Sequence, residues 1–201
     1  MSKHFIPAWN EFAPPPDTYR SIFKWGDPQQ FKHPNQRLYA LMKERFDLED
    51  GDFAQKQHEG NEKVTLDRPV ALSKKHLRAL RDIVGDQNIA TDDISRVRYA
   101  HGKTMEETMR LRRRIVQHAC DVVLHPRHKQ DVAEIVAYAH QHQIPVTVYG
   151  AGSSVNMGVT PEKGGITLVM QTHMNRILAL SEENHTVRVQ PGMLGKDYER
   201  M

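Results

Sequence analysis

The sequence predicts an α+β fold in which an extended arm and a set of helices precede a β-α-β unit and further strands. Three observations support this prediction. The first thirty residues hold five of the eleven prolines, which favours extended backbone. Apolar residues then recur at helical spacing up to about residue 115. From residue 121 onward, short runs of β-branched residues flank one helical segment and a glycine-rich stretch.

The arm, residues 1–34, carries aromatic side chains between its prolines. Proline fixes φ and removes a backbone donor, so this segment is expected to be extended. Its aromatic residues are Trp9, Phe12, Tyr19, Phe23 and Trp25. Large aromatic side chains are stabilised by burial, and we therefore expect the arm to lie against a folded body rather than fold alone.

Residues 35–115 form the predicted helical lead-in. Asn35 stands before apolar residues at helical spacing, as an N-cap does, and predicts a first helix. Residues 47–70 show no period and are expected to be an irregular connection. A second helix is expected between Ser73, a further N-cap, and Gly85, which suits a helix end.

The third helix of the lead-in is expected to begin at a capping box made by Thr104 and Glu107. Its apolar side is expected to extend over residues 105–119. Three consecutive arginines, residues 112–114, fall within this helix. A solvated face is the favoured interpretation, and contact with nucleic acid is the minority one.

The second domain is predicted over residues 116–201. Strands are expected at residues 121–124, 144–149, 166–170 and 186–190, and a helix at residues 129–142. The first two strands and the helix between them form the β-α-β unit. The last residues, which include Asp197 and Glu199, look like the first turn of a further helix.

Composition narrows the functional classes. The 201 residues include 28 Lys and Arg against 25 Asp and Glu, so charge alone predicts no nucleic-acid partner. The sequence has no apolar run long enough to span a bilayer and no recognisable targeting segment, so the expected location is the cytoplasm.

The single cysteine, Cys120, excludes a disulfide scaffold and a multi-cysteine zinc site. The histidines show no zinc-helix spacing, so no metal site is expected.

The segment from Gly150 to Gly158 carries the chemistry that the sequence indicates. It follows a strand directly, and its small residues and serine hydroxyls suit the binding of a phosphate or pyrophosphate by backbone amides. A tight turn that simply requires glycine is the structural alternative. A Rossmann loop is disfavoured because Val155 takes the third glycine position and no acid follows the next strand.

Together these motifs resemble the first half of the flavin domain of the vanillyl-alcohol oxidase superfamily, the PCMH-type FAD-binding domain. Within it, the sequence is most similar to the alkyldihydroxyacetonephosphate synthase family. The matching segments are Lys24-Trp-Gly26, Asp93 through Gly102, Leu111-Arg112, Pro126 followed by Asp131 through Ala139, Ile144-Pro145, Gly150 through Val155, Met174 through Leu178, Val187 through Gly192, and Gly195 through Glu199. The resemblance is strong over residues 93–201 and weak before them.

The resemblance implies that the glycine loop wraps the pyrophosphate of FAD. The family's seven loop positions are occupied here by Val148, Tyr149, Gly150, Ala151, Gly152, Ser153 and Ser154. Ala151 replaces a glycine, at a cost of roughly 1–2 kcal/mol if that position requires positive φ. Relatives that tether flavin through this loop have histidine where Gly152 stands, so the resemblance implies non-covalent FAD.

The activity implied by the family is formation of an ether-lipid bond, by exchange of an acyl chain for a fatty alcohol through a flavin adduct. The alternatives are an FAD-linked 2-hydroxy-acid oxidase or dehydrogenase, and an inactive FAD-binding fragment that acts only as a binding module. The family's catalytic residues lie outside these 201 residues, so no catalytic residue is assigned. A lipid-like or small hydroxy or phosphate substrate is expected for the full-length protein. Peripheral membrane contact and a homodimer stay open.

Overall fold

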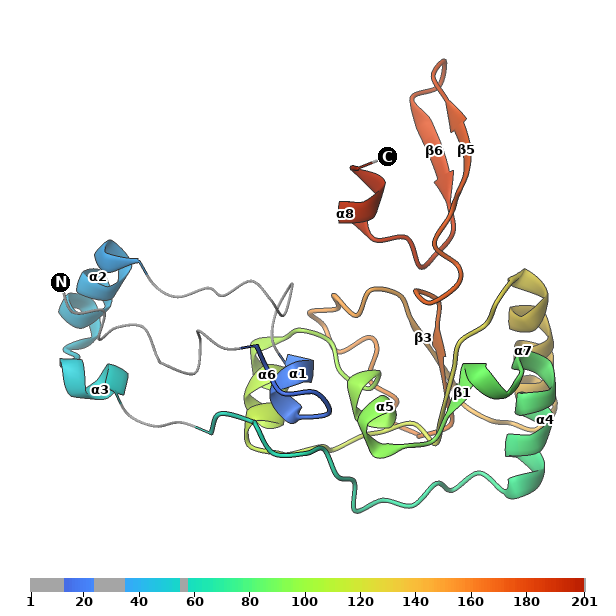
Figure 1. The fold of residues 1–201 in the computed structure, drawn as a ribbon, viewed down its shortest axis with the longest axis horizontal. Helices are drawn as coiled ribbons and strands as arrows, with labels where there is room; N and C mark the ends of the chain where they lie inside the picture. Colours follow the sequence, from blue (N-terminus) through green and yellow to red (C-terminus); the bar gives the residue numbers. More distant parts are fainter. Residues whose placement is uncertain (1–12, 24–34, 55–57, 201) are drawn as a thin grey trace. The chain divides into compact units, whose positions relative to one another are not determined.

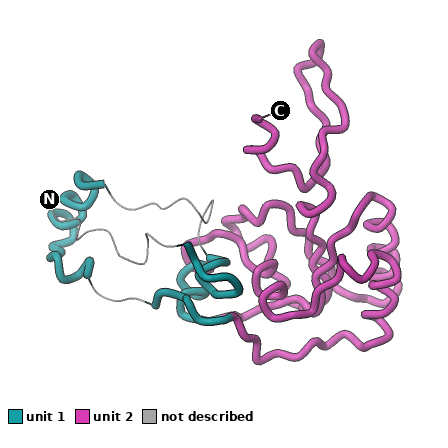
Figure 2. Tube along the Cα trace, viewed as in Figure 1, with its two compact units in different colours: residues 1–63, 108–115 teal, residues 64–107, 116–201 magenta. Residues whose placement is uncertain are grey.

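The computed structural model describes residues 13–23, 35–54 and 58–200. The chain divides into two compact units, of which one comprises residues 1–63 and 108–115 and the other residues 64–107 and 116–201 (Figure 2). The predicted three-part organisation, with boundaries after residues 34 and 115, stays a prediction. Each unit is described by itself.

The first unit is helical in its described part. Its helices are α1 (Tyr19–Phe23), α2 (Gln36–Phe46), α3 (Asp50–Ala54) and most of α6 (Met105–Arg112). The Asn35 side chain accepts a hydrogen bond from the backbone N–H of Leu38 at 2.9 Å, which confirms the predicted cap.

Three predictions of secondary structure were wrong here. The α1 turn replaces extended backbone within the arm, most of which lies outside the described residues. The α3 turn falls inside the segment expected to be irregular. Helix α6 ends at Arg112, short of residue 119, because Arg114 adopts a left-handed conformation with φ of 60°.

The second unit is built on a four-stranded sheet. Its strands are β1 (Ile89–Ala90), β2 (Val122–Leu124), β3 (Val146–Tyr149) and β4 (Ile166–Val169), in the order β1-β2-β4-β3. Strand β4 pairs in parallel with both β2 and β3, while β1 pairs antiparallel with β2. The first three predicted strands are confirmed, and the structure shows that they are parallel, with the third inserted between the other two. The two-residue strand β1 was not anticipated.

Helices cover both faces of this sheet. Helices α4 (Lys74–Val84) and α7 (Lys129–Gln141) lie side by side on one face (Figure 1), where Leu80, Ile135 and Leu168 belong to one buried core. Helix α5 (Asp93–Arg98) contacts β2. The side chain of Val123 packs with Tyr149 and Val169 in a second buried cluster. Because successive side chains of β2 point to opposite faces of the sheet, this strand contributes to both buried clusters.

The capping signals of α4 and α7 explain where these helices begin. The Ser73 and His128 side chains cap the first turns of α4 and α7, and Gly85 ends α4 with φ of 83°. The sequence predicted both helices to within two residues, α4 from its local cap and stop and α7 from the helical spacing of its apolar residues.

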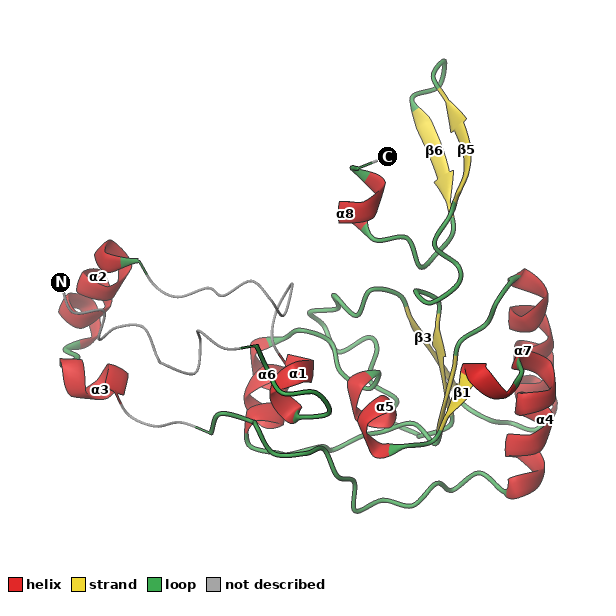
Figure 3. Cartoon of the chain, viewed as in Figure 1, coloured by secondary structure: helices red, strands yellow, loops and turns green. Residues whose placement is uncertain are grey.

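A separate hairpin follows the sheet. Strands β5 (Ile177–Ser181) and β6 (Thr186–Val189) pair antiparallel and form a two-stranded sheet of their own (Figure 3). Residues 186–189 thus form the predicted strand, with β5 as a partner that was not anticipated. A short helix, α8 (Gly195–Tyr198), lies where a first helical turn was expected. None of the described helices has the length and apolar character that crossing a bilayer requires.

Candidate functional site

The glycine loop follows β3 at the carboxyl end of the parallel strands. It runs from Gly150 to Gly158 without a helix and leads on to β4. Within the described part of the chain, none of the backbone N–H groups of residues 150–157 donates a hydrogen bond. A run of free amides at the carboxyl edge of a parallel sheet is a site that suits an anionic ligand.

Gly152 is the residue of the loop for which glycine is doubly required. Its φ is +66°, and a Cβ there would overlap the phenol oxygen and Cζ of Tyr149 and lie 2.8 Å from its Cε1. Ala151 has no positive φ, so its methyl group adds no backbone strain. A Cβ at Gly150 would meet only the carbonyl oxygen of Pro191, at 3.6 Å. The loop therefore accommodates the methyl group of Ala151, and of the two glycines only Gly152 requires the absence of a side chain.

Tyr149 fills the space beneath the loop. Its ring meets that of Tyr99 edge to face, with centroids 5.1 Å apart, and its side chain is buried. Burial is the main reason that the pKa of Tyr149 is raised to about 12, with the nearby Tyr99 adding to the effect and Arg98 opposing it. Tyr149 is therefore a neutral hydrogen-bond donor at physiological pH.

Ser154 is held in place in the middle of the loop. Its carbonyl oxygen accepts a hydrogen bond from the backbone N–H of Lys103 at 2.7 Å. Its hydroxyl bonds to the Asn156 side chain at 2.9 Å and accepts from the N–H of Gly158 at 3.1 Å. The first half of the loop is thus fixed by β3 before it and by Ser154 after it, with free amides between them.

The residues that hold Ser154 were not identified as site residues from the sequence. They are Gly102 and Lys103, in the connection between α5 and α6, and Glu107, in the first turn of α6. The resemblance included the pair of His101 and Gly102 but offered no physical role for it. The capping box was the only local signal, because the contact with the loop joins distant parts of the chain.

Two histidines lie at the same edge of the sheet and were also missed. His125, directly after β2, bonds to the Thr172 hydroxyl at 2.7 Å, and His173, after β4, bonds to the Asn88 side chain at 2.7 Å. Burial, and then the proximity of His173, lower the pKa of His125. Tyr99 packs against the ring of His125 as well as that of Tyr149, so these groups form a row that leads to the glycine loop.

Other reactive groups of the described residues do not form a site. Cys120 is buried, and burial raises the pKa of its thiol, which disfavours the reactive thiolate. The described residues contain no group of three or more side chains that could hold a metal ion.

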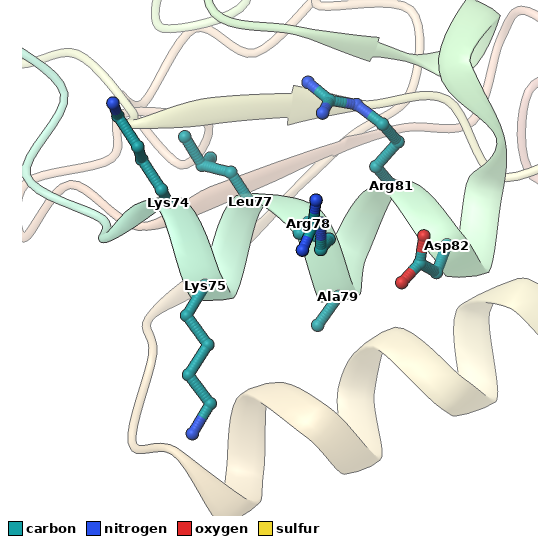
Figure 4. A pocket seen from close by; sticks show the side chains of 7 residues that line it. All are labelled: Lys74, Lys75, Leu77, Arg78, Ala79, Arg81 and Asp82. Carbon is teal, nitrogen blue, oxygen red and sulfur yellow. The ribbon is translucent and has the colours of Figure 1, made fainter.

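A surface hollow lies over α4, away from the glycine loop. Its lining comes from that helix alone, and Figure 4 shows Lys74 and Lys75 extending in different directions. The basic groups therefore do not converge on one point, as recognition of a small anion would require.

The glycine loop meets the physical requirements of a pyrophosphate site. Free amides, serine hydroxyls and the Tyr149 phenol supply donors, and the small residues of the loop let a ligand approach its backbone closely. The loop has no crossover helix, which distinguishes it from a Rossmann loop as expected. The fold and the loop together suit a domain that binds a ligand with a pyrophosphate group.

Comparison with known proteins supports this class. Residues 120–201 match the family model described as "FAD binding domain". A solved structure of an alkyldihydroxyacetonephosphate synthase superposes with a TM-score of 0.63 at 23% identity, over 72% of this chain and 26% of the other. This likeness confirms the predicted α+β fold, and the family match to residues 120–201 supports FAD as the cofactor.

Curated relatives fall into two functional groups. The glycolate oxidase subunit GlcD of Bacillus subtilis (strain 168) is 29% identical over 129 residues, 64% of this chain and 25% of that protein. The alkyldihydroxyacetonephosphate synthase of Trypanosoma brucei brucei is 25% identical over 173 residues, 83% of this chain and 28% of that protein. The chain spans about a quarter of the length of these relatives.

Proposed function

We propose that this chain is the FAD-binding portion of a flavoenzyme of the alkyldihydroxyacetonephosphate synthase type, with FAD held non-covalently by residues 148–154. The observation that carries the proposal is the run of free amides over residues 150–157, which follows β3 inside the segment similar to FAD binding domains. The choice of family rests on the synthase of Trypanosoma brucei brucei, which matches over 83% of this chain.

In this proposal the chain binds and orients the cofactor. The amides of Gly150, Ala151, Gly152 and Ser153 donate to pyrophosphate oxygens, and the Ser153 hydroxyl adds a further donor. The Tyr149 ring supports the loop from beneath and leaves no room for a side chain at position 152. A histidine at that position, which a covalent tether would need, is therefore sterically excluded. Bound flavin would supply the electron-accepting ring at which substrate reacts.

FAD binding is the direct test of this role. Titration of the purified chain with FAD, followed by flavin fluorescence and calorimetry, is expected to give saturable binding. Denaturation of the complex should release all of the flavin, because no covalent bond is formed. A chain that binds no FAD at micromolar concentrations would rule out the proposal, and flavin retained after denaturation would rule out its non-covalent part.

Oxidation or dehydrogenation of a 2-hydroxy acid is the second candidate activity. The similarity to the glycolate oxidase subunit of Bacillus subtilis favours it, as does a D-lactate dehydrogenase of Arabidopsis thaliana that is 30% identical over 120 residues. Assays on a longer protein that contains this chain distinguish the two activities. Loss of flavin absorbance on addition of glycolate or D-lactate indicates oxidation, whereas exchange of an acyl chain for a fatty alcohol indicates ether formation.

The remaining expectations belong to the same proposal. A lipid substrate would bring the full-length protein to a membrane surface, which sedimentation with vesicles tests. A cytoplasmic location and a homodimer are tested by fractionation of cells and by light scattering. FAD binding without either activity in the longer protein would favour the binding-module alternative.

A further inference from the structure

The connection between α5 and α6 lies directly against the glycine loop. The backbone N–H of Lys103 donates to the carbonyl oxygen of Ser154 at 2.7 Å. A Cβ at Gly102 would overlap that same oxygen and lie 3.1 Å from both the carbonyl carbon and the Cβ of Ser154. Gly102 has no positive φ, so glycine is required here for close approach and not for backbone conformation.

Glu107 holds this connection from the other side. Its buried carboxylate accepts hydrogen bonds from the N–H of Gly102 at 2.8 Å and from the N–H of Thr104 at 3.0 Å. These two amides flank that of Lys103. Because both neighbours are bound to one carboxylate, the direction of the Lys103 N–H toward Ser154 is restricted.

A capping box explains only part of this arrangement. In such a box the glutamate bonds to the N-cap amide, here that of Thr104, and the threonine hydroxyl bonds to the Glu107 amide, as observed at 2.9 Å. The bond from Gly102 to the second carboxylate oxygen lies outside that motif. It extends the hold of Glu107 to the residue that contacts the glycine loop.

The position of the Ser154 carbonyl affects the donors of the loop. A trans peptide is planar, with its C=O and N–H pointing in opposite directions. Since the Ser154 carbonyl points at Lys103, the N–H of Val155 in the same peptide points away from the connection. The loop hence presents its amides between an end fixed by β3 and an end fixed by this contact.

We propose that Glu107 is a positioning residue for FAD, which acts through Gly102 and Lys103 on the Ser154 end of the pyrophosphate loop. This inference rests on the proposed function, since it assumes that the loop holds the cofactor. Glu107 does not touch FAD in this arrangement. Its carboxylate keeps the loop in the binding conformation before the cofactor arrives, which removes an ordering cost from binding.

Two variants and a matched control test the proposal. Gly102→Ala introduces the methyl group that overlaps Ser154, and Glu107→Gln replaces one acceptor with a donor at nearly constant volume. Glu106→Gln changes the exposed neighbouring glutamate on the same helix. The dissociation constant for FAD is measured well below the unfolding temperature of each variant, so that loss of stability alone does not change it.

The expected result is a rise of at least fivefold in the dissociation constant for Gly102→Ala and Glu107→Gln, and no change for Glu106→Gln. Normal FAD binding by both folded variants would overturn the role of Glu107 and leave the proposed function intact. Absence of binding by the unmodified chain would instead remove the proposed function and this inference with it.

Hydrogen exchange in the unmodified chain keeps the proposal testable if a variant does not fold. Saturation with FAD is expected to slow exchange of the Lys103 amide at least tenfold, because a bound cofactor holds the Ser154 end of the loop in place. An unchanged exchange rate at Lys103 in the saturated protein would contradict the proposed coupling.

Discussion

The phenol oxygen of Tyr149 occupies the space that a side chain at position 152 would need, so Tyr149 and Gly152 constrain each other. Gly152 also has a φ of +66°, which only glycine adopts readily. Tyr149 is the last residue of β3, and Gly152 lies in the loop that follows. Stability and the proposed binding of FAD by this loop are therefore expected to be coupled at this point of the chain.

Gly152→Ala is expected to lower the free energy of unfolding by at least about 1–2 kcal/mol, from the positive φ alone. The overlap with Tyr149 adds to that loss. In the Gly152→Ala background the overlap is absent once Tyr149→Ala removes the ring. The loss of unfolding free energy in the double variant is therefore expected to be smaller than the sum of the two single losses. Chemical denaturation of the FAD-free chain measures all three. Additive effects would show that the two side chains do not compete for space.

Gly150→Ala provides the control for that cycle. A Cβ at Gly150 meets only the Pro191 carbonyl oxygen at an ordinary distance of 3.6 Å, and its φ is not positive. Its effect on the unfolding free energy is expected to stay within about 0.5 kcal/mol. A loss as large as that of Gly152→Ala would contradict the structure of the loop.

Tyr149 is expected to make stability depend on alkaline pH. Its pKa is raised to about 12 in the folded chain, mainly by burial, against about 10 in the unfolded chain. Between these values the unfolded state releases the proton and the folded state keeps it, so stability is full below about pH 10 and falls as pH rises toward 12. Tyr149→Phe should weaken this fall, measured by denaturation at several pH values. Identical pH profiles for both proteins would be the contrary result.

His101 is expected to make stability depend on acidic pH. Burial is the main cause of its lowered pKa, with Lys103 and His118 adding to the effect, while the bond to the Val97 carbonyl and the charge of Glu107 oppose it. The unfolded chain takes up the proton near pH 6.5, before the folded chain does. The free energy of unfolding should thus be full above about pH 6.5 and decline below it.

His101→Asn should reduce this acid sensitivity, because an amide group can donate to the Val97 carbonyl without titrating. His140→Asn, on the exposed side of α7, is the matched control. Thermal unfolding between pH 5 and 8 measures both. An equal reduction in the two variants would show that the effect is not specific to His101.

Asp121 ties the segment before α4 to the start of β4. Its buried carboxylate accepts from the N–H of Ala71 at 2.7 Å and from the N–H of Gly165 at 2.9 Å. Asp121→Ala leaves these amides without an acceptor and is expected to cost about 1–3 kcal/mol of unfolding free energy. Asp82→Ala, at an exposed site on α4, should have little effect in the same denaturation experiment. Similar losses for both would indicate that the two amides find other acceptors.

Local signals in the sequence predicted the elements that depend on local chemistry. The caps at Asn35 and Ser73 and the capping box of Thr104 and Glu107 were visible because each bond joins residues three positions apart. Strand β3 was visible from its β-branched residues. Strands β1 and β5 were not, since the former has only two residues and the latter lacks clean alternation.

The candidate site was predictable only in part. The sequence indicated the glycine loop, because small residues after a strand have a direct physical purpose. It did not indicate that Tyr149 occupies the space at Gly152, nor that Gly102 approaches Ser154. Both depend on how the backbone turns in space. The second also joins residues that lie on opposite sides of the β2-α7-β3 crossover in sequence.

That separation has a consequence for the order of folding. The bond between Lys103 and Ser154 closes a long stretch of chain. Bringing the two ends of such a stretch together costs conformational entropy, which opposes early formation of the bond. Once β2, α7 and β3 have assembled, the two segments are already close and the remaining loss is small. The glycine loop is therefore expected to acquire its final shape late, and under the proposed function FAD binding would report on completed folding of the parallel sheet.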